Sequence, residues 1–155
     1  MTIANTVYIA LGANLGDRRA NIARAIDLLR STPGITVTKV SDLIETAAVG
    51  GPPDSPPYLN GAAELQTTLD PEPLLDRLLA IEAEIGRVRR QKWEARLIDL
   101  DLLLYGNQII RTPKLQVPHP LMHTRRFVLQ PLAQIAPKTI HPTLGLRIAE
   151  LLAAQ

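Results

Sequence analysis

Cysteine is absent from this 155-residue sequence. Its absence excludes disulfide bonds, thiolate metal sites and cysteine nucleophiles, and it is typical of a reducing compartment. Aromatic residues make up only 3% of the chain. Sheets that bind single-stranded RNA stack bases on exposed aromatic side chains, so this low content disfavours an RNA-binding domain.

Long apolar runs are missing as well. No stretch approaches the ~20 residues that span a bilayer, and residues 1–5 are too few and too polar for a signal peptide. Gly12 and Gly16 do not have the GxGxxG or GxxxxGK[ST] spacing of a phosphate-binding loop. We therefore expect a cytoplasmic protein without a membrane partner, and any phosphate site must be built from other residues.

The sequence does contain enough apolar residues for one core. Hydrophobic residues make up 46% of the chain, and a domain of this length buries about two-thirds of its unfolded surface. The formal net charge is only +2, although the isoelectric point is about 9.2. This basicity is therefore local, which favours a small anionic ligand over a nucleic-acid backbone. We expect residues 1–155 to form a single domain that acts as a monomer.

Apolar periodicity and breaker residues predict the secondary structure. Strands are predicted at residues 6–11, at 35–40 with an extension toward Thr46, at 58–68 and at 96–105. Helices are predicted at 17–33, 70–86, 125–136 and 146–154, and the proline-rich residues 47–57 are a surface loop and a candidate lid. The order β-α-β-β-α-β indicates an α+β, ferredoxin-like fold, an antiparallel sheet with helices on one face and extra C-terminal helices. The opposite face of the sheet would then be free.

The central motif is the strand RLIDLDLLLY at residues 96–105. Asp99 and Asp101 alternate with four apolar residues: Ile98, Leu100, Leu102 and Leu104. This alternation puts one face in the core and both carboxylates on the other, about 7 Å apart at the backbone. Two such carboxylates can converge on a pair of cations about 3.5–4 Å apart, and oxygen ligands suit Mg²⁺. The simpler alternative is a half-solvated strand whose outer face carries two acids.

A basic segment leads directly into this strand. Five of residues 87–96 are cations: Arg87, Arg89, Arg90, Lys92 and Arg96. Such a segment is usually a solvated loop. Here it shares one end of a strand with two acids. A polyphosphate that the acids hold through Mg²⁺, and that Arg and Lys clamp directly, would satisfy both signs of charge.

Several motifs, in order along the chain, carry a family resemblance. They are LGANLG at residues 11–16, YLN at 58–60, GRVR at 86–89, KWEARLIDLDLL at 92–103, VPHP at 117–120 and RRF at 125–127. Together they resemble 6-hydroxymethyl-7,8-dihydropterin pyrophosphokinase of folate biosynthesis, over nearly the full length of the chain. That family transfers the β,γ-pyrophosphoryl group of ATP to the hydroxymethyl oxygen of a reduced pterin and releases AMP.

The resemblance implies a set of site residues. Asp99 and Asp101 are implied to hold two Mg²⁺ ions and to act in catalysis with Arg87 and Arg96. The residues implied to contact ATP are Glu82, Arg89, Lys92, Trp93, Ile98, Leu102, His119 and Arg125. Those implied to contact the pterin are Thr46, Val49, Tyr58, Asn60, Trp93 and Phe127, with the ring between Tyr58 and Phe127. ATP and the pterin are thus the expected partners, and residues 1–155 the expected pyrophosphokinase domain.

Some of these roles compete with simpler structural ones. Phe127 is the only phenylalanine and could be a core residue, and Tyr58 could cover a strand end. Asn60 and Glu82 favour binding roles, because Asn is uncommon in strands and Glu82 lies on an apolar helix face. Four residues depart from the usual family pattern: Ala47, Leu79, Lys114 and Gln116. The alternative function is a ferredoxin-like nucleotide- or RNA-binding module without catalysis.

Overall fold

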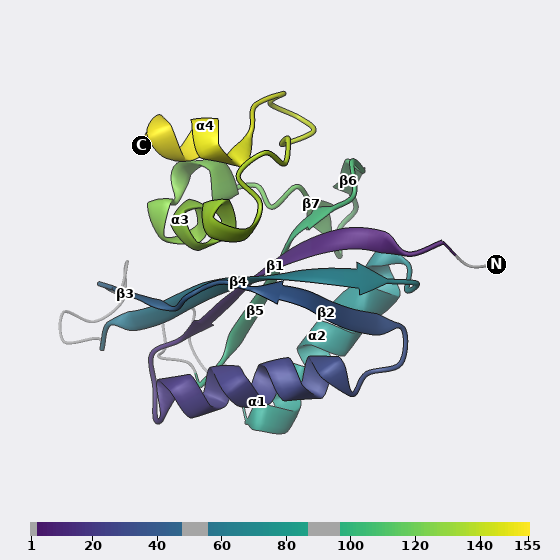
Figure 1. Ribbon diagram of the computed structural model, residues 1–155. Coiled ribbons are helices and arrows are strands. Elements are labelled where there is room, and N and C mark those ends of the chain that lie inside the picture. Colours follow the sequence, from purple (N-terminus) through teal and green to yellow (C-terminus); the bar gives the residue numbers. More distant parts are fainter. Residues whose placement is uncertain (1–2, 48–55, 87–96) are drawn as a thin grey trace.

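The computed structural model describes residues 3–47, 56–86 and 97–155 of the chain (Figure 1). Its elements in chain order are β1 (Asn5–Ala13), α1 (Arg18–Arg30), β2 (Ile35–Val40), β3 (Ile44–Thr46), β4 (Tyr58–Thr67), α2 (Pro71–Ile85), β5 (Asp99–Tyr105), β6 (Ile110–Arg111), β7 (Gln116–Val117), a short 3₁₀ helix (Met122–Thr124), α3 (Arg126–Ile135) and α4 (Ile148–Ala153).

Strands β1 to β5 form one antiparallel sheet. β1 pairs with β4 on one side and with β5 on the other, and β4 also pairs with β2, which gives the order β2-β4-β1-β5. The short strand β3 pairs with the first residues of β4, beyond the end of β2. The predicted α+β, ferredoxin-like architecture is therefore confirmed.

Helices cover both faces of this sheet. In Figure 1, α1 and α2 lie against one face, α3 lies against the other, and α4 packs on the outer side of α3. The first core includes Ile9, Leu11, Leu29, Leu65, Leu74 and Leu78, and the second includes Tyr8, Ala62, Leu104, Leu129, Leu132 and Ile148. The prediction of a free second face is wrong where α3 packs, because this amphipathic helix needs a surface on which to bury its apolar side chains.

A register shift in β5 changes which face its last residues occupy. Tyr8 lies opposite Leu104 but Ile9 lies opposite Leu102, so Leu103 is an extra residue in β5. Leu103 and Leu104 consequently both join the second core, and Tyr105 returns to the first. The sequence alternation correctly placed Leu102 on the first face and wrongly placed Leu104 there, because a bulge reverses the alternation beyond it.

The edge strand is also interrupted, so the predicted extension of 35–40 toward Thr46 is wrong. Val40 pairs with Ala63 and Ile44 pairs with Asn60, which leaves one more residue on the edge than on β4. A Cβ added at Gly61 would lie only 2.7 Å from the Leu43 side chain, so the glycine allows the bulged segment to approach β4 closely. As a result β3 is a separate strand of three residues.

The ends of α1 and α2 follow from local sequence signals. The Asp17 carboxylate accepts a hydrogen bond from the Ala20 amide at 3.1 Å and so caps α1. Pro71 begins α2, and Gly86 ends it with a positive φ of 108°. Among the described residues, no helix is both long enough and apolar enough to cross a membrane.

Candidate active site

Asp99 and Asp101 lie in β5, on the part of the second face that borders an open cavity. Both side chains are half-buried, and they lie opposite Gly12 and Ala10 of β1. The cavity has a volume of about 300 Å³. Its polar wall consists of Glu82, Asp99, Asp101, Lys114, Gln116 and His119, and leucines from α2 and β5 supply much of the apolar wall. A charged phosphate chain and a flat base could both be accommodated in a cavity of this composition.

Glu82 connects α2 to the backbone between the two aspartates. Its side chain is only 3% exposed, and its carboxylate accepts a hydrogen bond of 2.7 Å from the amide of Leu100. Among the described strands β5 is the last of the sheet, so this amide lies on the edge of β5 that faces away from β1. Glu82 therefore fixes the edge of β5 at the point where Asp99 and Asp101 flank Leu100. The same side chain also lines the cavity, as a nucleotide contact would.

His119 lines the cavity, and one of its ring nitrogens already has a hydrogen-bond partner. Its Nδ1 accepts a hydrogen bond from the Leu121 amide at 3.2 Å, so the proton of the neutral ring lies on Nε2. Burial lowers the pKa of the imidazole, the charge of Arg125 lowers it further, and Asp99 partly opposes both. A pKa below its ordinary value keeps the ring neutral at neutral pH. His119 can therefore donate a hydrogen bond from Nε2 to an anion without carrying a charge itself.

Arg125 and Phe127 lie together at the start of α3. The guanidinium carbon of Arg125 is 5.7 Å from the centre of the Phe127 ring, which is the geometry of a cation–π contact. Phe127 is only partly buried and packs against the second core. The structure thus brings a predicted ATP residue into contact with a predicted pterin residue. Phe127 as a whole is partly exposed, unlike a residue at the centre of the core.

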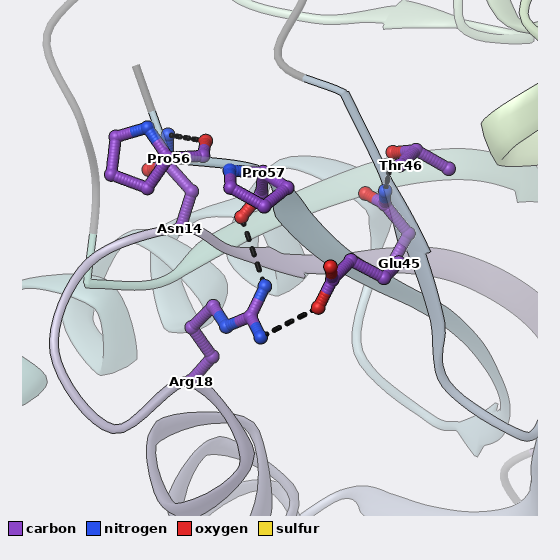
Figure 2. Close-up of polar contacts among 7 residues, drawn as sticks. Asn14, Arg18, Glu45, Thr46, Pro56 and Pro57 are labelled. Carbon is purple, nitrogen blue, oxygen red and sulfur yellow. Dashed lines mark hydrogen bonds and ion pairs between the residues drawn. The ribbon is translucent and has the colours of Figure 1, made fainter. Parts of the chain in front are cut away.

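The predicted pterin residues Thr46, Tyr58 and Asn60 gather at the start of β4. The amide nitrogen of Asn60 donates to the Thr46 hydroxyl at 2.6 Å, the contact drawn at Thr46 in Figure 2. This bond fixes the orientation of an amide that is only 7% exposed. Tyr58 is half-buried and lies opposite Thr46 in the ladder. The unusual Asn within a strand therefore has a defined partner on β3.

Gly12 lies between the predicted pterin residues at the start of β4 and the aspartates of β5. No role was assigned to it from the sequence. It pairs with Asn60 of β4 on one side and with Asp99 of β5 on the other. Directly paired residues point to the same face, and adjacent strands are about 4.8 Å apart, so Asn60 and Asp99 lie roughly 10 Å apart on one face. A Cβ added at Gly12 would lie 3.4 Å from the Asn60 oxygen and 3.7 Å from the Tyr58 ring. The predicted strand ended at residue 11, before Gly12, so this close approach was not anticipated from the sequence.

Other predicted residues have different positions. Leu102 lines the cavity, whereas Ile98 is fully buried in the first core and does not. Leu79, Lys114 and Gln116, which depart from the family pattern, all line the cavity, and Lys114 forms an ion pair with Asp76 at 2.7 Å. Six predicted site residues lie outside the described residues: Val49, Arg87, Arg89, Lys92, Trp93 and Arg96.

The carboxylates that line the cavity fit a hard cation that is coordinated partly by the protein and partly by a bound substrate. Within residues 3–47, 56–86 and 97–155, no group of three or more His, Asp or Glu side chains could enclose a metal ion. Two half-buried carboxylates at a cavity wall suit Mg²⁺, which is usually bound by one or two carboxylates together with water and substrate phosphates.

Comparisons with known proteins agree with this geometry. Residues 8–137 match the family described as 7,8-dihydro-6-hydroxymethylpterin-pyrophosphokinase. A Pseudomonas aeruginosa protein is 47% identical over 148 residues, covering 96% of this chain and 90% of that protein. One from Bacillus subtilis is 47% identical over 131 residues, covering 84% and 78%. Both are named 2-amino-4-hydroxy-6-hydroxymethyldihydropteridine pyrophosphokinase.

Solved structures show the same fold at low sequence identity. Wild-type Plasmodium falciparum HPPK-DHPS with pterin and p-hydroxybenzoate superposes with a TM-score of 0.76 at 16% identity. The match covers 99% of this chain but only 43% of the Plasmodium chain. The present chain thus spans less than half of that larger protein, and the likeness concerns the fold alone.

Proposed function

This chain belongs to the 7,8-dihydro-6-hydroxymethylpterin-pyrophosphokinase family, and we propose how its residues divide between its two substrates. The enzyme transfers the pyrophosphoryl group of ATP to the hydroxymethyl group of 6-hydroxymethyl-7,8-dihydropterin, giving the pterin diphosphate and AMP, in folate biosynthesis. The alternative of a binding module without catalysis has no support from its relatives, which are named as pyrophosphokinases.

The observation that carries the proposal is the row Asn60–Gly12–Asp99 across three strands. We assign the pterin to the β4 side of this row, where Asn60 and Thr46 meet its hydrogen-bonding edge and Tyr58 and Phe127 contact its faces. The triphosphate is assigned to the β5 side, in the cavity beside Asp99 and Asp101. With roughly 10 Å between the two sides, a bound pterin can extend its hydroxymethyl oxygen toward the phosphates.

Asp99 and Asp101 are proposed to hold two Mg²⁺ ions. When bound, these ions would neutralise charge on the triphosphate and lower the pKa of the attacking hydroxyl. The residues of the chain then mainly position groups, since phosphoryl transfer has a loose transition state that needs little covalent help. His119 donates from Nε2 to a phosphate oxygen, and Arg125 supplies positive charge beside it. Arg87 and Arg96 are proposed to stabilise the charge that develops on the transferring group.

The remaining contacts with ATP are proposed on the α2 side of the cavity. Glu82 and Leu102 would contact the nucleoside, and Leu79, Lys114 and Gln116 border the same space. The phosphates are also proposed to contact Arg89, Lys92 and Trp93. Ile98 is proposed to support these ATP contacts from the core. Val49 is proposed to contact the pterin. We also propose that residues 1–155 act as one monomeric domain in the cytoplasm without nucleic acid, consistent with the net charge of +2.

Product analysis tests the proposed reaction directly. The purified protein, ATP, Mg²⁺ and 6-hydroxymethyl-7,8-dihydropterin should yield AMP and the pterin diphosphate in equal amounts. Omission of the pterin or addition of EDTA should stop AMP release, because water must not replace the acceptor and the triphosphate needs its cations. Formation of ADP, or AMP release that is independent of the pterin, would contradict the assignment.

Replacing Phe127 with Ala should weaken pterin binding and leave ATP binding unchanged. The ring is proposed to stack on the pterin, and such a contact is worth about 1 kcal/mol beyond its buried area. Titration calorimetry with the pterin and with a non-hydrolysable ATP analogue measures the two affinities separately. Equal losses for both ligands would instead indicate that Phe127 only supports the core or Arg125.

A further inference from the structure

A single arginine at the start of α1 contacts both β3 and the residue that directly precedes β4. One arm of the Arg18 guanidinium donates to the Pro57 carbonyl at 3.0 Å, and the other forms an ion pair of 2.8 Å with Glu45 (Figure 2). Nearby, the Asn14 amide donates to the Pro56 carbonyl at 3.2 Å. The connection between β1 and α1 thus holds the chain at the end of β3 and at the start of β4.

These contacts lie one residue away from the proposed pterin residues. Glu45 directly precedes Thr46, and Pro57 directly precedes Tyr58. Thr46 and Tyr58 are themselves paired in the ladder. The guanidinium of Arg18 therefore bridges the residues that precede Thr46 and Tyr58. Together with Asn60, this pair is proposed to contact the edge and one face of the pterin.

The pairing of β3 with β4 needs such support because β3 is short. β3 has three residues, and in the part of the chain that the structure describes it pairs with β4 from Ile44 to Thr46. Strand ends with so few ladder bonds fray easily. An arginine can hold two separate acceptors at once because its donors form a rigid fork, whereas a lysine offers one compact charge.

We propose that Arg18 is a positioning residue for the pterin. Through its contacts with Glu45 and Pro57, Arg18 sets the separation of Thr46 and Tyr58. This role rests on the pterin site proposed above. The Arg18 and Glu45 side chains are 29% and 56% exposed, so their ion pair contributes little to global stability. Loss of Arg18 should therefore lower the affinity for the pterin without unfolding the protein.

Calorimetry on a set of four variants tests this role. Arg18→Ala is expected to weaken binding of 6-hydroxymethyl-7,8-dihydropterin on the order of tenfold, because the free pocket is no longer preorganised. Binding of a non-hydrolysable ATP analogue and the melting temperature should stay unchanged. Arg18→Lys and Glu45→Gln each keep part of the network and should lose less. The matched control is Arg19→Ala, the same charge change at an exposed neighbour for which the described residues show no hydrogen bond or ion pair.

Three results would overturn the proposal. In the first, Arg18→Ala and Arg19→Ala bind the pterin with equal affinity. In the second, Arg18→Ala loses affinity for the pterin and for the nucleotide equally. In the third, the melting temperature of Arg18→Ala falls enough to account for the lost affinity. Lack of pterin binding by the unmodified protein is a different outcome. It would contradict the pterin site itself, and with it the role of Arg18.

Discussion

Replacing Asp101 with Asn is expected to lower turnover on the order of 10³-fold, because removal of a metal-binding carboxylate forfeits several kcal/mol of charge stabilisation in the transition state. The same loss is expected for Asp99→Asn. Asn has the same shape as Asp, and both positions are half-buried at a cavity wall, so the fold should survive. The loss should therefore appear in kcat while the melting temperature stays close to that of the unmodified enzyme.

A magnesium titration separates this role from a general effect of charge. Because each variant keeps one carboxylate, the Mg²⁺ concentration for half-maximal rate should rise in both. Asp27→Asn is the control, since Asp27 is exposed on α1 and its loss changes the net charge equally. A variant at Asp99 or Asp101 with normal turnover and a normal Mg²⁺ requirement would contradict the metal assignment, although the family membership would stand.

Local patterns were sufficient to predict strands β1, β2, β4 and β5, the four α-helices and their order. Period-two alternation predicted β5, and the Asp17 and Gly86 signals predicted helix ends that the structure contains. These features depend on neighbouring residues, so one sequence can reveal them. The same holds for Asp99 and Asp101, whose exposure follows from the alternation up to Leu102.

Features that depend on pairing between distant strands were not predictable. The bulge at Leu103 exists because Tyr8 and Ile9 skip a residue of β5, and the break after Val40 depends on how Leu43 meets Gly61. No local pattern encodes such a register. The covering of the second face by α3 was missed as well, because the sequence of an amphipathic helix does not specify which surface it packs on.

The candidate site shows the same difference between local sequence signals and contacts between distant parts of the chain. The motifs identified Asn60 and Asp99, but only the sheet register reveals that both pair with Gly12. Likewise, Arg18 follows the LGANLG motif without any signal that it reaches Glu45 and Pro57. From the sequence, Glu82 was expected to contact ATP and was noted as a charge on an apolar helix face, whereas its hydrogen bond to the Leu100 amide is visible only in the structure.

Glu82→Leu is expected to destabilise the protein and to impair catalysis together. The change leaves the Leu100 amide without an acceptor, which costs about 1–3 kcal/mol for a buried donor. It also frees the edge of β5 between Asp99 and Asp101. Because a misplacement of about 1 Å in a catalytic group can cost on the order of 10²-fold in rate, turnover should fall by this order. Glu82→Gln keeps an acceptor oxygen and should retain most of both properties.

Hydrogen exchange at one amide distinguishes this role from a contact with ATP. The Leu100 amide should be protected in the unmodified protein and in Glu82→Gln, and it should exchange rapidly in Glu82→Leu, even without nucleotide. Glu84→Leu and Glu84→Gln, at an exposed position on the same helix, are the matched controls. If Glu82 served only the nucleotide, its loss would weaken ATP binding and leave the Leu100 amide as protected as before. Rapid exchange together with a lower kcat would instead show that α2 sets the position of both aspartates through this single carboxylate.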